Sequence, residues 1–180
     1  MRSPAVAEED PHDLSADEGG FARVSNVSMN ALARRGLSVH ELRDSLARRE
    51  FSDEEIESEI DRLVRVGLLD DTELARTLVR TLRERKGLGH AALTAELRRR
   101  RLDGAAIETA LAEADDHDEF ARAHELAAKR APQLRHVEPD AARRRLGGYL
   151  MRKGYSSGVV HAVVDRVLAS TERTQGPRFE

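Results

Sequence analysis

Apolar residues recur along the chain in three series that share one spacing. Each series holds five apolar positions, separated by steps of four, five, five and four residues. Steps of four keep residues on one face of a helix, whereas steps of five across a polar break do not. Each series therefore predicts a helix, a tight turn and a second helix. The series are Leu42, Leu46, Phe51, Ile56 and Ile60; Leu93, Leu97, Leu102, Ile107 and Leu111; and Leu146, Leu150, Tyr155, Val160 and Val164.

The residue after the central apolar position of each series suits the start of a helix. It is Ser52, Asp103 or Ser156, and the side-chain oxygen of such a residue can accept a hydrogen bond from a free amide of the following helix. Ser52 is followed three residues later by Glu55, which completes a capping box. We therefore predict that the second helix of every hairpin begins after this residue.

A further helix is predicted before each hairpin. The segment 70–76 (DDTELAR) recurs as 116–122 (DHDEFAR), and both copies open with an Asp-x-x-Glu cap. A looser copy at 21–23 starts the first module. The first two of these helices lead into Gly36 and Gly87, where a left-handed residue commonly ends a helix. Ser38 and Glu41 then form another capping box.

The pattern predicts an all-α chain of three tandem three-helix, helix-turn-helix-like modules, which we expect to form an elongated curved array. Aromatic residues make up 3% and charged residues 35% of the chain, which favours amphipathic helices over a sheet. The modules span 21–69, 70–115 and 116–170, and the third has a connection seven residues longer, near Pro132 and Pro139. We expect an acidic disordered segment at 1–20 and a disordered tail at 171–180.

Charge and cysteine content narrow the classes of function. The first 27 residues hold six acidic side chains against two arginines, and the remaining chain is close to neutral, which argues against a bulk nucleic-acid coat. The chain has no cysteine, so disulfides and thiol nucleophiles are excluded. No apolar run is long enough for a membrane span or a signal peptide, and we expect a cytoplasmic protein without membrane contact.

The order and spacing of these motifs resemble the RecX family over residues 21–169. The resemblance rests on ARRGLS at 33–38 before Glu41, GLLDD at 67–71, RKG at 85–87, ELR at 96–98 and YLMRKGYS at 149–156. It implies a non-enzymatic negative regulator of homologous recombination and DNA repair. Such a regulator binds the RecA-DNA filament, inhibits its ATPase and strand exchange, and favours its disassembly.

The chain departs from the RecX pattern in two of its hairpin turns. The family tends to place glycine just before the apolar turn residue, and here only Gly154 does so, because Glu50 and Arg101 occupy the other two positions. A residue with a Cβ resists the left-handed conformation. We therefore do not expect a left-handed turn at those two positions.

Paired cations at the hairpin turns are the candidate binding residues. Taken singly, each pair suits the negative end of a helix dipole and a solvated face. Their recurrence at one offset favours a binding edge for acidic recombinase surface or phosphates. Arginines at 143–145 are weaker candidates, because consecutive residues point to different faces. The candidates are Arg48, Arg49, Arg98, Arg99, Arg100, Arg101, Arg152 and Lys153, together with Arg34, Arg35, Arg85 and Lys86.

We expect no enzyme, no metal and no cofactor. The acids at 115–119 lie close to His117 and His124, but helix capping explains them. No glycine-rich phosphate loop and no nucleophile elbow is present. We expect a monomer whose partner is the RecA filament, with weak contact to single- or double-stranded DNA.

Two rival functions differ in testable ways. A stand-alone helix-turn-helix-like DNA-binding protein should place base-reading residues on one recognition helix. A tetratricopeptide scaffold should repeat every 34 residues or so, whereas equivalent positions here lie 51 residues apart from Leu42 to Leu93 and 53 residues apart from Leu93 to Leu146.

Overall fold

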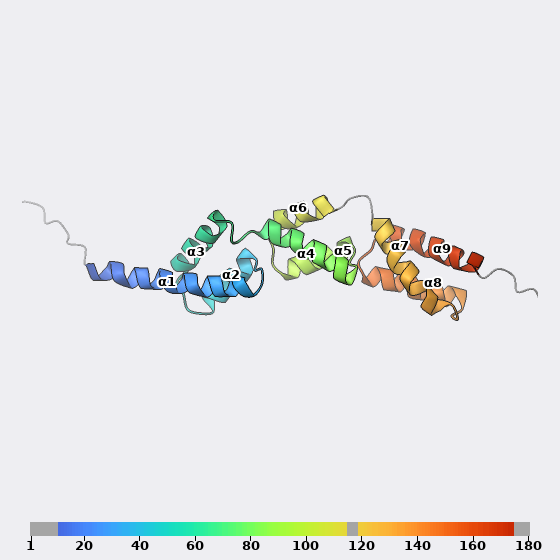
Figure 1. Cartoon of the computed structure of the whole chain (residues 1–180), viewed down its shortest axis with the longest axis horizontal. Helices are drawn as coiled ribbons and strands as arrows, with labels where there is room; N and C mark the ends of the chain where they lie inside the picture. The colour runs from blue at the N-terminus through green and yellow to red at the C-terminus, as the bar shows by residue number, and fades with distance from the viewer. Residues whose placement is uncertain (1–10, 115–118, 175–180) are drawn as a thin grey trace, which may run out of the picture. The chain divides into compact units, whose positions relative to one another are not determined.

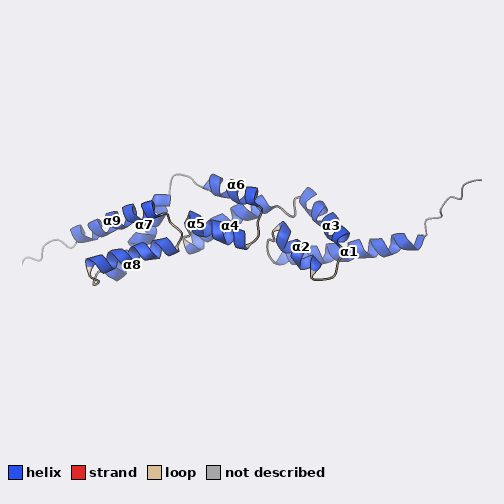
Figure 2. Ribbon diagram, turned by 180° about the vertical axis from the view of Figure 1, so that it is seen from behind, coloured by secondary structure: helices blue, strands red, loops and turns tan. Residues whose placement is uncertain are grey.

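The protein is helical throughout the part of the chain that the structure describes. The computed structural model describes residues 11–114 and 119–174, and within them it contains nine α-helices, one short 3-10 helix and no strand (Figures 1 and 2). The all-α prediction is confirmed. The elements are α1 (Pro11–Arg34), α2 (Val39–Ala47), α3 (Asp53–Arg65), α4 (Asp71–Lys86), α5 (His90–Arg99), α6 (Gly104–Ala114), α7 (Glu119–Arg130), η1 (Ala131–Leu134), α8 (Pro139–Arg152) and α9 (Ser157–Thr174).

The helices form three modules, each with its own apolar core. The chain divides into two compact units, one ending at Asp70 and the other beginning at Asp71. Helices α1 to α3 enclose the core of the first unit. The second unit contains two cores, one among α4 to α6 and the other among α7 to α9. Three three-helix modules were predicted and are confirmed, while the curved array stays a prediction.

The residues of the three apolar series form the centres of these cores. All of them are buried, and the most exposed retains 7% of its surface. Leu42, Leu93 and Leu146, at the first position of each series, are fully buried. The shared spacing therefore identifies the side chains around which each module packs.

The predicted caps hold the second helix of every hairpin. The Ser52 hydroxyl accepts a hydrogen bond from the amide of Glu55 at 3.2 Å, and the Glu55 carboxylate accepts one from the amide of Ser52 at 2.8 Å. Asp103 accepts from the amide of Ala105 at 2.9 Å, and Ser156 accepts from the amide of Val159 at 3.4 Å. These caps confirm the predicted helix starts. The proposed cap at Asp116 lies outside the described residues.

All three hairpin turns contain a left-handed residue, which corrects the expectation for two of them. Glu50 has φ of 62° and Arg101 has φ of 53°, beside 86° at Gly154. This conformation costs a residue with a Cβ about 1 to 2 kcal/mol. It lets the amide of Leu102 donate to the Leu97 carbonyl at 3.4 Å and returns Leu102 to the core. Burial of the turn residue thus offsets the backbone strain.

Two boundaries differ from the prediction, and one connection agrees with it. Helix α1 begins at Pro11 and α9 continues to Thr174, so both helices extend beyond the predicted module bounds of 21 and 170. Proline suits the first helical position, and extending a packed helix adds a hydrogen bond for each residue fixed. The longer connection of the third module lies where it was predicted, as η1 and the loop before α8. Gly87 is left-handed, with φ of 59°, whereas Gly36 is not.

The core assignment predicts a large contrast between two leucines. Leu97 is fully buried, whereas Leu68 is 50% exposed. We expect Leu97→Ala to lower the free energy of unfolding by about 2 to 5 kcal/mol, and Leu68→Ala to change it by less than about 1 kcal/mol. Chemical denaturation of both variants measures the difference. Equal losses would contradict the central place of Leu97 in its module.

Candidate functional site

The cations of the hairpin turns lie at equivalent structural positions in all three modules. In each turn two cations directly precede the left-handed residue and the buried turn residue. They lie at the C-terminal end of α2, α5 or α8, where positive side chains oppose the negative end of the helix dipole. The equivalent pairs are Arg48 and Arg49, Arg99 and Arg100, and Arg152 and Lys153.

The first cation of each pair is exposed. Arg48, Arg99 and Arg152 all lie at the surface, and Arg99 forms an ion pair with Glu96 one turn earlier. Among the second cations, Arg49 is exposed, whereas Arg100 and Lys153 are half-buried. The exposed first position is therefore the feature that the three turns share.

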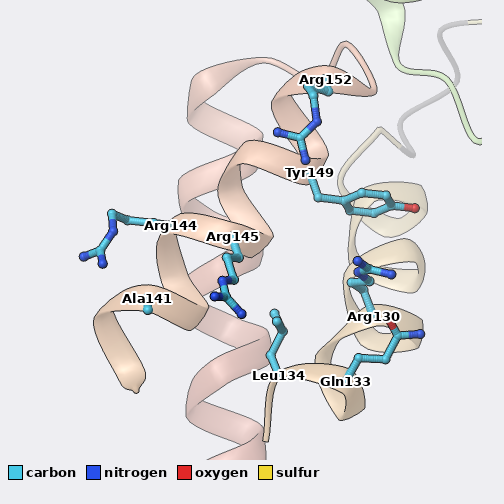
Figure 3. A pocket seen from close by; sticks show the side chains of 8 residues that line it. All are labelled: Arg130, Gln133, Leu134, Ala141, Arg144, Arg145, Tyr149 and Arg152. Carbon is cyan, nitrogen blue, oxygen red and sulfur yellow. The ribbon is translucent and has the colours of Figure 1, made fainter. Parts of the chain in front are cut away.

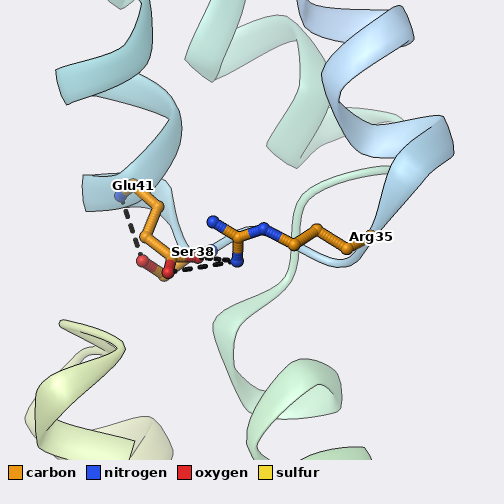
Figure 4. A network of polar contacts seen from close by, with 3 residues as sticks. All are labelled: Arg35, Ser38 and Glu41. Atoms are coloured by element: carbon orange, nitrogen blue, oxygen red, sulfur yellow. Dashed lines mark hydrogen bonds and ion pairs between the residues drawn. The ribbon is translucent and has the colours of Figure 1, made fainter.

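In the first module the structure gathers four of the predicted cations around one hollow. The hollow has a volume of about 650 Å³ and lies between the end of α1 and the end of α2. Its lining includes Arg34 and Arg35 from the first and Arg48 and Arg49 from the second. The Glu41 carboxylate also lines this hollow. It accepts a hydrogen bond from the Ser38 amide and pairs with Arg35, both at 3.1 Å (Figure 4). The capping box thereby balances part of the local positive charge.

Two of the predicted cations belong to a junction between the second and third modules. Lys153 donates from Nζ to the carbonyl of Lys86 at 2.5 Å, while its own carbonyl accepts from the amide of Gly89 at 2.8 Å. The Gly154 carbonyl accepts from the amide of Ala91 at 3.1 Å. The end of α8 thus supplies carbonyls to free amides at the start of α5. Lys86 and Lys153 serve this contact, which the sequence did not predict.

The Tyr155 side chain adds to the same junction. Its hydroxyl donates to the Gly87 carbonyl at 3.3 Å. Burial raises the pKa of the Tyr155 hydroxyl, so the group stays protonated and able to donate. The buried turn residue of the third module therefore both fills its own core and contacts the second module.

The remaining predicted cations are scattered over the second module. Arg85 is exposed in the last turn of α4. Arg98 borders a shallow hollow between α5 and α6, which also contains Glu108. Arg101 is the left-handed turn residue itself. The structure does not bring these three side chains into one cluster.

The third module contains an arginine-lined groove that was largely missed. The groove has a volume of about 570 Å³ and contains one arginine from the end of α7 and three from α8 (Figure 3). Its lining consists of Arg130, Arg144, Arg145 and Arg152, together with Gln133, Leu134, Ala141 and Tyr149. Arg152 was among the main candidates, and Arg144 and Arg145 were named only as weaker ones. The available signal was the spacing of Arg145, Tyr149 and Arg152, whose steps of four and three place them on one helix face.

Elsewhere in the described chain, several cations are held by carboxylates. Arg43 binds Glu57 through two hydrogen bonds of 2.7 and 2.8 Å, which lower the pKa of that carboxyl. Arg76 likewise binds Glu113 through two hydrogen bonds of 2.6 Å, which lower the pKa of the Glu113 carboxyl. These exposed pairs contribute little to stability, but they occupy the cation. The groove of the third module differs from these pairs, because no carboxylate lies among its lining residues.

The described residues give no sign of a metal centre or a membrane helix. No group of three or more histidine and acidic side chains is placed to hold a metal ion in residues 11–114 and 119–174. The acids at 115–118 lie outside those ranges. Within the same ranges no helix combines the length and the apolar character needed to cross a bilayer.

Each of the three modules matches a known protein domain in sequence. Sequence profiles of the first, second and third three-helix domains of RecX match residues 26–63, 70–111 and 117–164. Each match falls inside one of the predicted modules.

Relatives of similar length support the same assignment. Regulatory protein RecX of Amycolatopsis mediterranei (strain U-32) is 35% identical over 88% of this chain and 90% of its own length. Regulatory protein RecX of Mycobacterium leprae (strain Br4923) is 37% identical over 89% of this chain and 93% of its own length. The crystal structure of RecX from Lactobacillus salivarius matches with a TM-score of 0.77 and 21% identity, over 83% of this chain and 97% of that one, which supports the fold. The chain therefore belongs to the RecX family of regulatory proteins.

Proposed function

We propose that this chain is a negative regulator of homologous recombination and DNA repair that binds the RecA-DNA filament. In this proposal it lowers ATP hydrolysis and strand exchange by RecA and favours disassembly of the filament. One observation carries the proposal beyond family membership. An exposed arginine stands two residues before the left-handed residue in every hairpin turn, as Arg48, Arg99 and Arg152.

The repeated position supports contact with a repeating partner. An exposed ion pair contributes at most about 1 kcal/mol, so a single turn cation would bind weakly. Three weak contacts on one chain reinforce one another through their effective concentration. A filament offers the same acidic or phosphate group at successive protomers, which suits a chain that presents the same cation three times.

Regulation by binding fits the side chains of the described residues. The candidate cations lie at the surface or at helix ends, and two of them, Arg35 and Arg99, form ion pairs with carboxylates of their own module. Bridging neighbouring protomers would hold them in an arrangement unsuited to ATP turnover. Blocking the filament groove would exclude other partners of RecA.

The N-termini of the second hairpin helices favour this function over a DNA reader. Helix α3 begins with Asp53, Glu54 and Glu55, and acids at this end repel phosphates. Helix α6 begins with Gly104 and two alanines, which offer few groups to read base edges. Neither helix resembles a recognition helix.

The proposal is tested by RecA turnover on single-stranded DNA. We expect ATP hydrolysis by preformed filaments to fall as this chain is added, and the chain to co-sediment with the filaments. Tight binding of the chain to a specific duplex, with RecA turnover unchanged at saturation, would replace this function with that of the DNA-binding alternative.

A further inference from the structure

The arginine-lined groove of the third module combines cations from two helices. Arg130 closes α7, while Arg145 and Arg152 lie two turns apart on α8, with Tyr149 between them. Seven residues of helix correspond to about 10 Å. Figure 3 shows the Tyr149 ring above Arg130 and on the same side of α8 as Arg145. The Arg130 guanidinium lies 5.7 Å from the centre of that ring.

The groove lacks a counter-charge in the part of the chain that the structure describes. Its lining contains no acidic side chain, and Arg144, Arg145 and Arg152 form no ion pair with the described residues. Their neighbour Arg143, on another face of α8, pairs instead with Asp165. Like charges gathered without a partner repel one another. An anion in the groove would relieve that repulsion.

The residues around the arginines indicate which anion fits. A guanidinium presents a planar fork of donors that matches phosphate oxygens. Tyr149 is only half-buried, and aromatic or guanidinium planes accept the stacking of nucleic-acid bases. The Gln133 amide can both donate and accept hydrogen bonds. An acidic peptide offers carboxylates to the arginines but no bases to stack on the ring.

We infer that this groove binds the phosphodiester backbone of a nucleic-acid strand. Arg130, Arg145 and Arg152 contact successive phosphates, and Tyr149 supports the strand between them. The inference goes beyond the filament contacts proposed above, because Arg130 and Arg145 belong to no hairpin turn. It can therefore be measured without RecA.

The test is the salt dependence of oligonucleotide binding by the double variant Arg130→Gln with Arg145→Gln. A fluorescent oligothymidylate of about 16 nucleotides and a duplex hairpin serve as separate probes. Removing two phosphate contacts should lower the slope of log K against log salt by about 1.4 on the single strand or about 1.8 on the duplex. Affinity at low salt should fall by about tenfold. The probe whose slope changes identifies the strand that the groove takes.

A matched control separates the groove from net charge. Arg65→Gln with Arg80→Gln removes two exposed arginines outside the groove, and it should leave the slope unchanged. Arg130→Lys with Arg145→Lys keeps the charges and should keep the slope, which would show that charge at these two positions sets it. A groove variant that binds both probes like the control overturns the inference. So does a variant that loses binding of polyglutamate while it retains both oligonucleotides.

Discussion

Reversing the charge at Arg48, Arg99 and Arg152 to glutamate is expected to release RecA from inhibition by this chain. These three arginines occupy one equivalent, exposed position in the three hairpin turns. Each contact contributes about 0.5 to 1 kcal/mol, and together they amount to about 1.5 to 3 kcal/mol before any added repulsion. The concentration of the chain that halves RecA ATP hydrolysis should therefore rise by at least about tenfold.

The controls for this prediction follow from the structure. Arg65→Glu, Arg80→Glu and Arg135→Glu change the net charge equally at exposed positions outside the hairpin turns, and this variant should still inhibit RecA. Each turn reversal also weakens a helix-dipole contact by about 0.3 to 1 kcal/mol, so helicity and the unfolding midpoint are measured alongside. Inhibition by the folded turn variant at the wild-type concentration would show that the cations form only a solvated face.

Arg152 requires a separate measurement because it also lines the groove of the third module. The double reversal Arg48→Glu with Arg99→Glu leaves the groove intact. A partial loss of inhibition in this double variant assigns the effect to the turns. Lys153 is left unchanged throughout, because its ammonium group and its carbonyl both serve the junction between modules.

The fold was predictable from sequence because its determinants are local. The helix-turn-helix period depends on residues within about twenty positions of one another, and the apolar positions of that period are the ones that the structure buries. The caps at Ser38 and Ser52 are equally local, since each box closes within four residues. Spacing and side-chain chemistry are sufficient for features of this kind.

The candidate site was predictable only in part, because it depends on contacts between segments far apart in sequence. The groove needs Arg130 of α7 opposite Arg145 of α8, and no spacing rule joins two helices across the longer connection. The left-handed conformation of Arg101 was judged from the residue alone. The burial of Leu102, which offsets its cost, follows from packing of the whole module.

The glycine at 154 is explained by the junction and not by its φ angle. Glu50 and Arg101 adopt the same left-handed conformation with full side chains. A Cβ at position 154, however, would overlap the amide nitrogen and Cβ of Ala92 at the start of α5. Glycine is therefore required there by the close approach of a second module.

This explanation predicts that Gly154→Ala disrupts the junction between the second and third modules. The left-handed conformation costs the alanine about 1 to 2 kcal/mol. Its Cβ must also push the turn before Tyr155 away from the start of α5. Separation breaks the hydrogen bonds from the amides of Gly89 and Ala91 and from the Tyr155 hydroxyl, each of which contributes about 0.5 to 1.5 kcal/mol. We expect a total loss of about 3 to 6 kcal/mol.

Gly67→Ala is the matched control, because Gly67 is also left-handed, with φ of 72°, but a Cβ there meets no atom within 4 Å. It should cost only the strain of about 1 to 2 kcal/mol. Amide hydrogen exchange at Gly89 and Ala91 reports on the junction directly, and protection there should fall in Gly154→Ala while it persists in Gly67→Ala. Equal losses of stability with protection retained at both amides would show that the junction is not what requires glycine at 154.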